Sequence, residues 1–349
     1  MAESFDEVRE LAEPELRLLL EHGRPEQRVW AIWALALRSS DAVEELARQA
    51  QPDAGVRRTL AVVLAGHGEL ELLVALARCD PAPDVRAAAM HLVARLALEG
   101  KLPIMLVQER AAAEGSEVRI AILGAIFAGT AAWLLDLAIT MLDASEPDVR
   151  YEAFEALVRA NASSHALAWL EEVPEAEARS VLMRWTARTP GDNDPVADRV
   201  RTCAQLLANA SRRVRRLLVE SVGVATWHDL APAIRDEPSL IAAFVRHGHH
   251  AIDEVPTAVL MAAQLRDHQD TWLGVIRSRL SVQQSPDAEL GALIPDYLER
   301  CEKRLSALDS QLAELRKAND IEDDELEQVE AHREELAMLC ELAVRSLVH

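Results

Sequence analysis

The chain has 349 residues and a net charge of −21, and half of its residues are hydrophobic. Binding to duplex nucleic acid depends on basic side chains that neutralise phosphates, so this charge argues against a general nucleic-acid-binding role. The first residues contain neither a basic segment nor an apolar segment of the kind that directs secretion, and we expect a cytoplasmic protein. Arginine outnumbers lysine 34 to 3, a bias typical of GC-rich bacterial genomes.

An arginine recurs seven times at the same point of an apolar helical pattern, at intervals of 29, 29, 33, 31, 29 and 36 residues. The seven residues, five of which follow a valine, are Arg28, Arg57, Arg86, Arg119, Arg150, Arg179 and Arg215. A period near 30 is typical of stacked helical hairpins, because one hairpin cannot bury its apolar face alone. We therefore predict an all-α fold, an α-solenoid of helical repeats, in which these arginines have a structural role.

The repeat around Arg86 begins Pro83-Asp84-Val85-Arg86, and the repeat around Arg150 begins in the same way. Proline costs no hydrogen bond in the first helical turn, and aspartate there suits the positive end of the helix dipole. After Val85, the residues Ala89, Leu92 and Leu96 follow at helical spacing and predict one apolar face. A second short helix is expected in each repeat, for example over 70–78, 102–110, 132–142 and 165–170.

This pattern resembles the HEAT-like repeats, in the short form also found in phycobilisome-lyase proteins, over residues 24–222. The resemblance implies a ladder of Asp–Arg contacts between adjacent repeats, which would include Asp84, Arg86, Asp148 and Arg150. The units of Arg28, Arg57 and Arg179 lack the full Asp-Val-Arg triplet, so the resemblance does not extend the ladder to them.

Residues 120–135 contain no charged side chain, but these 16 residues are too few to span a bilayer. The stretch is interrupted at Gly129-Thr130, so we predict two consecutive core helices and no membrane span. Trp30 and Trp33 lie three residues apart on an apolar helix, and we predict that both pack in the core.

Turn-forming residues occupy 189–195. Asp192 and Asp194 there resemble part of a calcium loop, but the loop's glutamate is missing. The arginine pattern ends after residue 222. Short apolar helices over 227–235, 240–247, 257–265 and 271–280 suggest degenerate repeats or a cap. The predicted domains are a capped repeat domain over 1–222, this region over 223–286, and a helical hairpin over 287–349.

Heptad spacing replaces the repeat pattern from residue 288 onward. Two runs of seven positions, 294–315 and 326–347, pair with one constant sum of residue numbers, 641, which predicts an antiparallel two-helix coiled coil. This hairpin has 17 acidic and 7 basic residues, a net charge of −10. Such charge usually forms a solvated face beside the apolar seam, and the alternative is a projecting hairpin used for dimerisation or partner docking. The same register sets Cys301 opposite Cys340, either as buried thiols or as a redox pair.

The one basic cluster is Ser211-Arg212-Arg213-Val214-Arg215-Arg216. If Val214 and Arg215 keep their repeat positions, Arg212, Arg213 and Arg216 face outward near a helix start, where they oppose the helix dipole and favour an anion. The alternatives are local acidic partners, the acidic hairpin of the same chain, an acidic partner, or a nucleic-acid strand.

Histidines gather at His247, His249, His250 and His268, but their spacing matches no metal-ligand motif. No phosphate loop, nucleophile elbow or hydrolase triad signature is present, and no histidine precedes a glutamate as in the iron-binding HEAT-repeat hydroxylases. We predict a non-catalytic scaffold without cofactor or metal that binds a protein partner. A regulatory subunit whose hairpin folds onto the basic edge is the alternative, and a lyase-type enzyme a weaker one.

Overall fold

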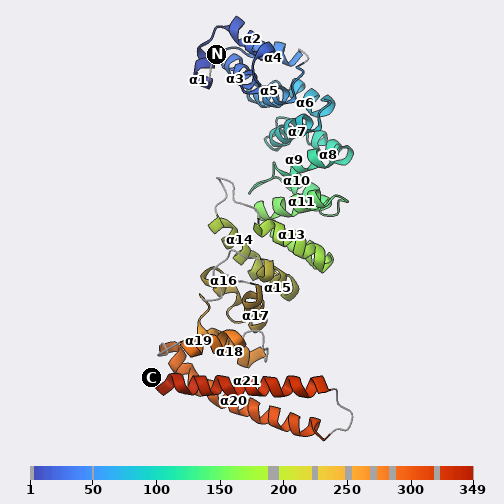
Figure 1. The fold of residues 1–349 in the computed structure, drawn as a ribbon. Coiled ribbons are helices and arrows are strands. Elements are labelled where there is room, and N and C mark those ends of the chain that lie inside the picture. Colours follow the sequence, from blue (N-terminus) through green and yellow to red (C-terminus); the bar gives the residue numbers. More distant parts are fainter. Residues whose placement is uncertain are drawn as a thin grey trace. The chain divides into compact units, whose positions relative to one another are not determined.

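The computed structural model describes residues 4–48, 51–187, 196–221, 227–247, 254–267, 273–282, 288–317 and 323–348. These residues form 21 helices and no strand, so the predicted all-α class is confirmed (Figure 1). The chain divides into two compact units: unit 1, Met1–Trp169, and unit 2, Leu170–His349. The boundary falls within helix α12.

Unit 1 is built from helices of 6 to 16 residues. They are α1 (Phe5–Glu10), α2 (Glu13–His22), α3 (Pro25–Ala36), α4 (Ser40–Arg48), α5 (Ala54–His67), α6 (Leu70–Cys79), α7 (Pro83–Leu98), α8 (Ile104–Ala113), α9 (Ser116–Leu123), α10 (Ala132–Met141), α11 (Pro147–Arg159) and α12 (Ser163–Glu172). Helices α3, α5, α7, α9 and α11 each contact the next member of this series, which is the pattern expected of consecutive hairpins.

Local sequence signals explain where the longer helices begin and end. Pro83 and Pro147 occupy the first turns of α7 and α11, and the Asp53 side chain accepts a 3.1 Å hydrogen bond from the Val56 amide at the start of α5. Helix α5 ends at Gly68, where φ is +80° and the Glu69 amide donates to the Leu64 carbonyl. This left-handed cap favours glycine, which has no Cβ to clash.

The predicted apolar face of α7 is only part of what the helix buries. Val85 and Ala89 are fully buried and Leu96 nearly so, whereas Leu92 is half-buried. Met90 and Val93 are buried as well, because α5 and α9 pack against different sides of α7. A helix inside a stack therefore needs a wider apolar surface than one heptad stripe.

Two sequence expectations in unit 1 need correction. The uncharged stretch is divided between α9 and α10, but α9 ends at Leu123 and is capped by Gly124, earlier than the predicted break at Gly129. Trp33 is 37% exposed and does not lie in the core, while Trp30 is half-buried. None of the described helices has the length and apolarity required to cross a bilayer.

Unit 2 continues with short helices and ends in two long ones. They are α13 (Glu175–Ala187), α14 (Val196–Asn209), α15 (Arg212–Ser221), α16 (Trp227–Ile234), α17 (Pro238–His247), α18 (Thr257–Asp267), α19 (Leu273–Val282), α20 (Ala288–Leu315) and α21 (Asp323–Val348). Helix α15 contacts α13 on one side and α17 on the other, so these three helices form one layer.

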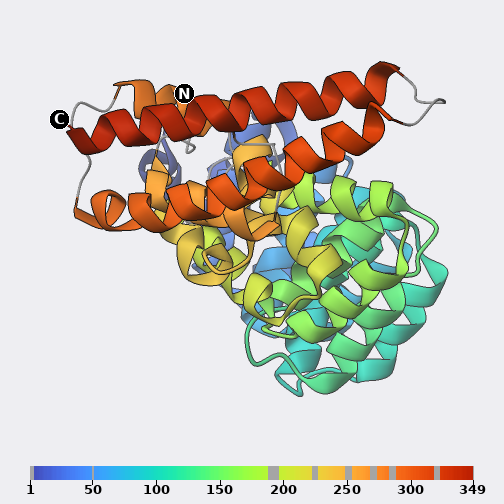
Figure 2. The ribbon, with the colours of Figure 1, turned by 90° about the horizontal axis from the view of Figure 1, so that it is seen from below.

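Helices α20 and α21 lie side by side (Figure 2). Helix α20 packs on α18, and helix α21 packs on α19. Arg333 Nε lies 2.5 Å from Asp309 Oδ1, and Arg316 Nη2 lies 2.6 Å from Glu330 Oε1. The residue number of the partner on α21 falls as the residue number on α20 rises, so the two helices are antiparallel. Ile294, Cys301, Leu312, Leu336 and Ala343 are buried at predicted seam positions.

Several predictions concern residues outside the described ranges. Asp192, Asp194, His249, His250 and His268 belong to this group. Among the described residues, no three or more His, Cys, Asp or Glu side chains gather as a metal-binding group. The boundaries predicted at 222/223 and 286/287 remain predictions.

Candidate partner-binding groove

The repeat arginines of unit 1 make two kinds of contact, one with their own helix entry and one with the following repeat. Arg57, Arg86 and Arg150 each donate from Nη1 to the carbonyls five and six residues earlier, at 2.7–3.3 Å. Arg28 and Arg119 donate from Nε to the Gly23 and Ala111 carbonyls. These hydrogen bonds fix the connection that leads into each arginine's own helix.

The second contact is with an acidic residue that lies just before the next helix in the series α3, α5, α7, α9 and α11. The pairs are Arg28–Asp53 at 3.7 Å, Arg57–Asp80 at 2.8 Å, Arg86–Glu114 at 3.3 Å and Arg119–Glu146 at 3.3 Å. A chain of ion pairs therefore joins consecutive repeats from α3 to α11.

Arg57 and Asp80 form the most buried of these pairs. The Arg57 guanidinium donates from Nε and Nη2 to both carboxylate oxygens, at 2.8 and 3.0 Å. The Asp80 side chain is only 2% exposed and that of Arg57 14%. The hydrogen bond with Asp80 raises the pKa of Arg57 above its ordinary value.

None of these four pairs includes Asp84 or Asp148, the acids that the family resemblance implies. Asp84 lies 3.7 Å from Arg58, the neighbour of the repeat arginine Arg57, and Arg86 pairs with Glu114. Arg57, to which the resemblance did not extend the ladder, makes the bidentate pair. The partner acids lie four to six residues before the next repeat arginine. Because this spacing varies, the sequence alone does not identify them.

In unit 2 the predicted basic cluster borders a groove of about 480 Å³ between α13, α15 and α17. We call it the arginine groove. Its lining residues are Glu175, Arg212, Arg213, Arg216, Glu220, Ser239, Leu240, Ala243 and Arg246. Leu240 and Ala243 are buried and give the groove an apolar floor, while its four arginines outnumber its two glutamates.

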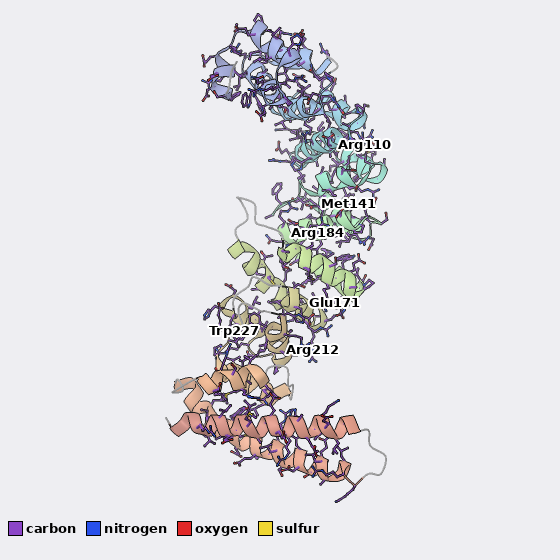
Figure 3. The ribbon with its side chains drawn as sticks, viewed as in Figure 1. Arg110, Met141, Glu171, Arg184, Arg212 and Trp227 are labelled. Carbon is purple, nitrogen blue, oxygen red and sulfur yellow. The ribbon has the colours of Figure 1, made fainter. Side chains whose placement is uncertain are left out.

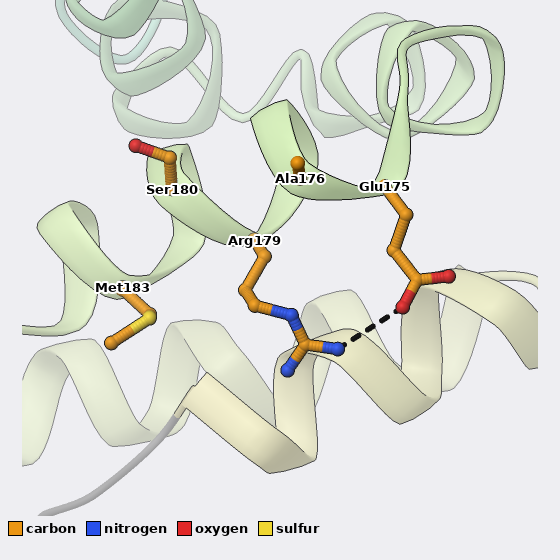
Figure 4. Close-up of a pocket in the computed structure, with 5 residues that line it drawn as sticks. All are labelled: Glu175, Ala176, Arg179, Ser180 and Met183. Atoms are coloured by element: carbon orange, nitrogen blue, oxygen red, sulfur yellow. Dashed lines mark hydrogen bonds and ion pairs between the residues drawn. The ribbon is translucent and has the colours of Figure 1, made fainter.

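The two glutamates neutralise part of this positive charge through ion pairs. Glu175 lies 3.1 Å from Arg179 (Figure 4) and 3.0 Å from Arg216. The hydrogen bond from Arg179 lowers the pKa of Glu175. Glu220, with a side chain 5% exposed, lies 2.7 Å from Arg179 Nη1 and 3.7 Å from Arg216 Nε. Burial opposes the charge of Arg179, but hydrogen bonds with Glu175 and Glu220 raise its pKa.

The three arginines predicted to bind a partner differ in what they contact. Arg213 donates to the carbonyls of Leu170, Glu171 and Val173 at 2.7–2.8 Å, so it caps the end of α12. Arg216 pairs with Glu175 yet keeps a side chain 48% exposed. Arg212 is exposed and makes no hydrogen bond or ion pair with any other described residue (Figure 3).

Arg215, the last repeat arginine, does not contribute to the groove. It pairs with Glu237 and donates to the Ala233 carbonyl at 2.6 Å. It is half-buried and does not line the groove. Arg212 and Arg216, four residues apart on α15, both line the groove, whereas Arg215 does not.

Sequence reasoning did not find the contributions of α13 and α17. Ser239, Ala243 and Arg246 lie at helical spacing on α17 and meet α15 only once the repeats stack. The spacing 239–243–246 is the signal that could have found them, given the α15–α17 register.

Comparisons of the chain with protein-family models, with curated proteins and with solved structures find no match. The arrangement of the side chains is therefore the basis for the functional argument.

Proposed function

We propose that this protein is a scaffold of HEAT-like repeats, an α-solenoid with a C-terminal coiled-coil hairpin, that binds an acidic segment of a partner protein in the arginine groove. The observation that carries the proposal is the excess of arginine in that groove, with Arg212 exposed and unpaired among the described residues, in a chain of net charge −21. A groove in which arginines outnumber acids attracts anions even in an acidic protein.

The groove's shape favours a peptide over a simple ion. Its rim is charged and its floor is apolar, through Leu240 and Ala243, which is the composition of sites that hold a polypeptide segment. We expect the occupant to carry two or more carboxylates beside an apolar side chain. Guanidinium groups bind carboxylates through paired, charge-assisted hydrogen bonds, so Arg212 and Arg216 would determine specificity.

A nucleic-acid strand suits the groove less well. Strand binding needs a basic track along several phosphates, usually with exposed aromatic side chains for stacking. The described lining residues include no aromatic side chain. The surrounding negative charge would also repel a polyanion longer than the groove.

The acidic hairpin of the same chain is not the occupant that we propose. The described lining of the groove comes from α13, α15 and α17 and includes no residue of α20 or α21. Helices α20 and α21 contact α18, α19 and each other. The hairpin therefore leaves the groove open to a partner, and it could bind a second copy or another protein on its own surface.

The test is a fluorescence-anisotropy titration of the full chain with a labelled peptide that alternates glutamate and leucine. We expect saturable binding that weakens at least tenfold in the double variant Arg212→Glu/Arg216→Glu. The matched control is Arg48→Glu/Arg58→Glu in unit 1, which makes the same charge change at side chains 70% and 55% exposed. It should leave the affinity within about twofold.

Two results would count against the proposal. Equal losses in the groove variant and in Arg48→Glu/Arg58→Glu would show attraction to overall charge rather than a site. Tighter binding of a single-stranded oligonucleotide than of the peptide would favour a nucleic-acid function. Circular dichroism and thermal unfolding of each variant would show that the fold is retained.

A further inference from the structure

Helices α20 and α21 bring two cysteines to the same level of their interface, far along the chain from the arginine groove. The ion pair between Asp309 and Arg333 fixes the register of the two helices. Cys301 stands eight residues before Asp309, and Cys340 seven residues after Arg333, which corresponds to about 12 and 10.5 Å of helix. Because the helices are antiparallel, both cysteines lie at nearly the same height.

The two thiols contact each other. Each side chain hydrogen-bonds with the other, and Tyr297, one turn before Cys301, also hydrogen-bonds with Cys301. Tyr297 is fully buried and donates to Gln264 Oε1 of α18 at 2.8 Å. Cys301 is fully buried and Cys340 is half-buried, so a reagent has access to the pair through Cys340.

The surroundings favour the thiolate of Cys301. The hydrogen bond with Cys340, supported by Tyr297 and by the nearby charge of Arg304, lowers the pKa of Cys301. The same hydrogen bond and burial raise the pKa of Cys340. Cys203 provides a contrast within the chain, because burial alone raises its pKa to about 12.

We infer that Cys301 and Cys340 form a reversible dithiol–disulfide site that can link α20 covalently to α21. The inference is independent of the proposed function, because the cysteines line no part of the arginine groove. Both thiols are free in the structure, as are Cys79, which is exposed, and Cys203, which is buried. Only Cys301 and Cys340 have a second thiol within hydrogen-bonding reach.

A low-molecular-weight disulfide such as oxidised glutathione is a sufficient oxidant. Cys340 reacts through the fraction that has lost its proton: this accessible thiolate attacks the disulfide bond of glutathione, which breaks, forms a mixed disulfide with Cys340 and releases one glutathione as a thiol. The Cys301 thiolate then attacks the Cys340 sulfur, which forms the intramolecular bond and releases the second glutathione. The two protein thiols lose two electrons and two protons, and both pass to the two glutathione molecules.

The consequence is a change in how firmly the two long helices are held together. A disulfide between Cys301 and Cys340 closes a loop that contains the connection between α20 and α21, and it lowers the conformational entropy of the unfolded chain. Oxidation would therefore stabilise the hairpin, and a reductant would return it to its present state. The site would make any partner contact of the hairpin sensitive to thiol redox conditions.

The experiment treats the folded, full-length protein with a series of reduced-to-oxidised glutathione ratios and follows it by intact mass and peptide mapping. We expect a monomer that has lost two hydrogen atoms and in which the peptides of Cys301 and Cys340 are linked. Its unfolding midpoint should rise by several degrees and fall back on addition of dithiothreitol. Cys203 should stay unmodified.

The Cys340→Ser variant is the matched test of the order of events. Removing the accessible thiol should leave Cys301 unmodified by glutathione under native conditions, since Cys301 is fully buried. Three results would overturn the inference: a lasting glutathione adduct on Cys340 without a link to Cys301, a link that involves Cys79, or no reaction of the pair while Cys79 reacts. A Cys79→Ser background removes competing dimers without touching the pair.

Discussion

The repeat arginines of unit 1 differ in role from the arginines that line the groove of unit 2, none of which belongs to the repeat pattern. In unit 1, Arg28, Arg57, Arg86 and Arg119 each pair with one acid of the next repeat. In unit 2, four arginines line one groove with two glutamates, and Arg212 pairs with none of the described acids. A repeat arginine with its own acid serves the fold, whereas arginines added beyond the local acids are available to bind a ligand.

The largest effect should come from the buried pair of unit 1. Asp80→Ala should lower the free energy of unfolding by about 3 kcal/mol, because it leaves the buried guanidinium of Arg57 without its counter-charge. Urea unfolding followed by circular dichroism measures this loss. The matched control is Asp84→Ala, whose carboxylate is 52% exposed and 3.7 Å from Arg58, and which should cost about 0.5 kcal/mol or less. Equal losses would remove the distinction between the two acids.

A smaller effect should separate the arginines within the basic cluster. Arg213→Ala should cost about 1–2 kcal/mol, because three carbonyls at the end of α12 lose their donor. Arg212→Ala should stay within about 0.5 kcal/mol of the unchanged protein, since Arg212 is exposed. Thermal unfolding of the two variants tests this order, and a larger loss for Arg212→Ala would contradict it.

Removing an acid from the groove should strengthen binding rather than weaken it. Glu175→Gln takes away the charge that pairs with Arg179 and Arg216, so affinity for the acidic peptide should rise by roughly threefold to tenfold. Anisotropy titration at low and high salt measures the change, which added salt should reduce. Glu71→Gln, the same change at an exposed position of unit 1, should have no effect.

The smallest effect is the pH dependence of Glu175. Its pKa is lower in the folded state, so its contribution to stability is present above the unfolded-state pKa and is lost as the pH falls through the folded-state pKa. The difference in unfolding midpoint between the protein and Glu175→Gln should therefore be seen at neutral pH and disappear in acid. A difference that grew on acidification would show that the sign is wrong.

The sequence predicts the helices better than it predicts their contacts. Pro83 and Pro147 mark helix starts because proline is compatible with the first turn, and the arginine period gives the number of residues per hairpin. The partner acids Asp80, Glu114 and Glu146 could not be identified, since their offset from the next arginine varies with each connection. The early end of α9 at Gly124 was missed because the apolar pattern continues past it.

The sequence predicts only the part of the groove that lies on α15. Arg212 and Arg216 follow from the helical period of one element, whereas Ser239 and Arg246 reach the groove only through the packing of α17 on α15. Arg213 follows the same local pattern, yet its guanidinium donates to carbonyls at the end of α12. Local periodicity shows which side of a helix a residue occupies, and tertiary packing decides what it meets there.

The most direct measurement is site-specific photo-cross-linking in the native host. A photoreactive amino acid replaces Ser239 in the groove or, as the control, Met105 in unit 1, which is 65% exposed. The account predicts that the Ser239 position cross-links to an acidic segment of a protein partner, and that Arg212→Glu/Arg216→Glu abolishes this product. Cross-linking of the same partner from Met105 alone, or a Ser239 product unaffected by the two substitutions, would contradict the assignment of the arginine groove as the binding site.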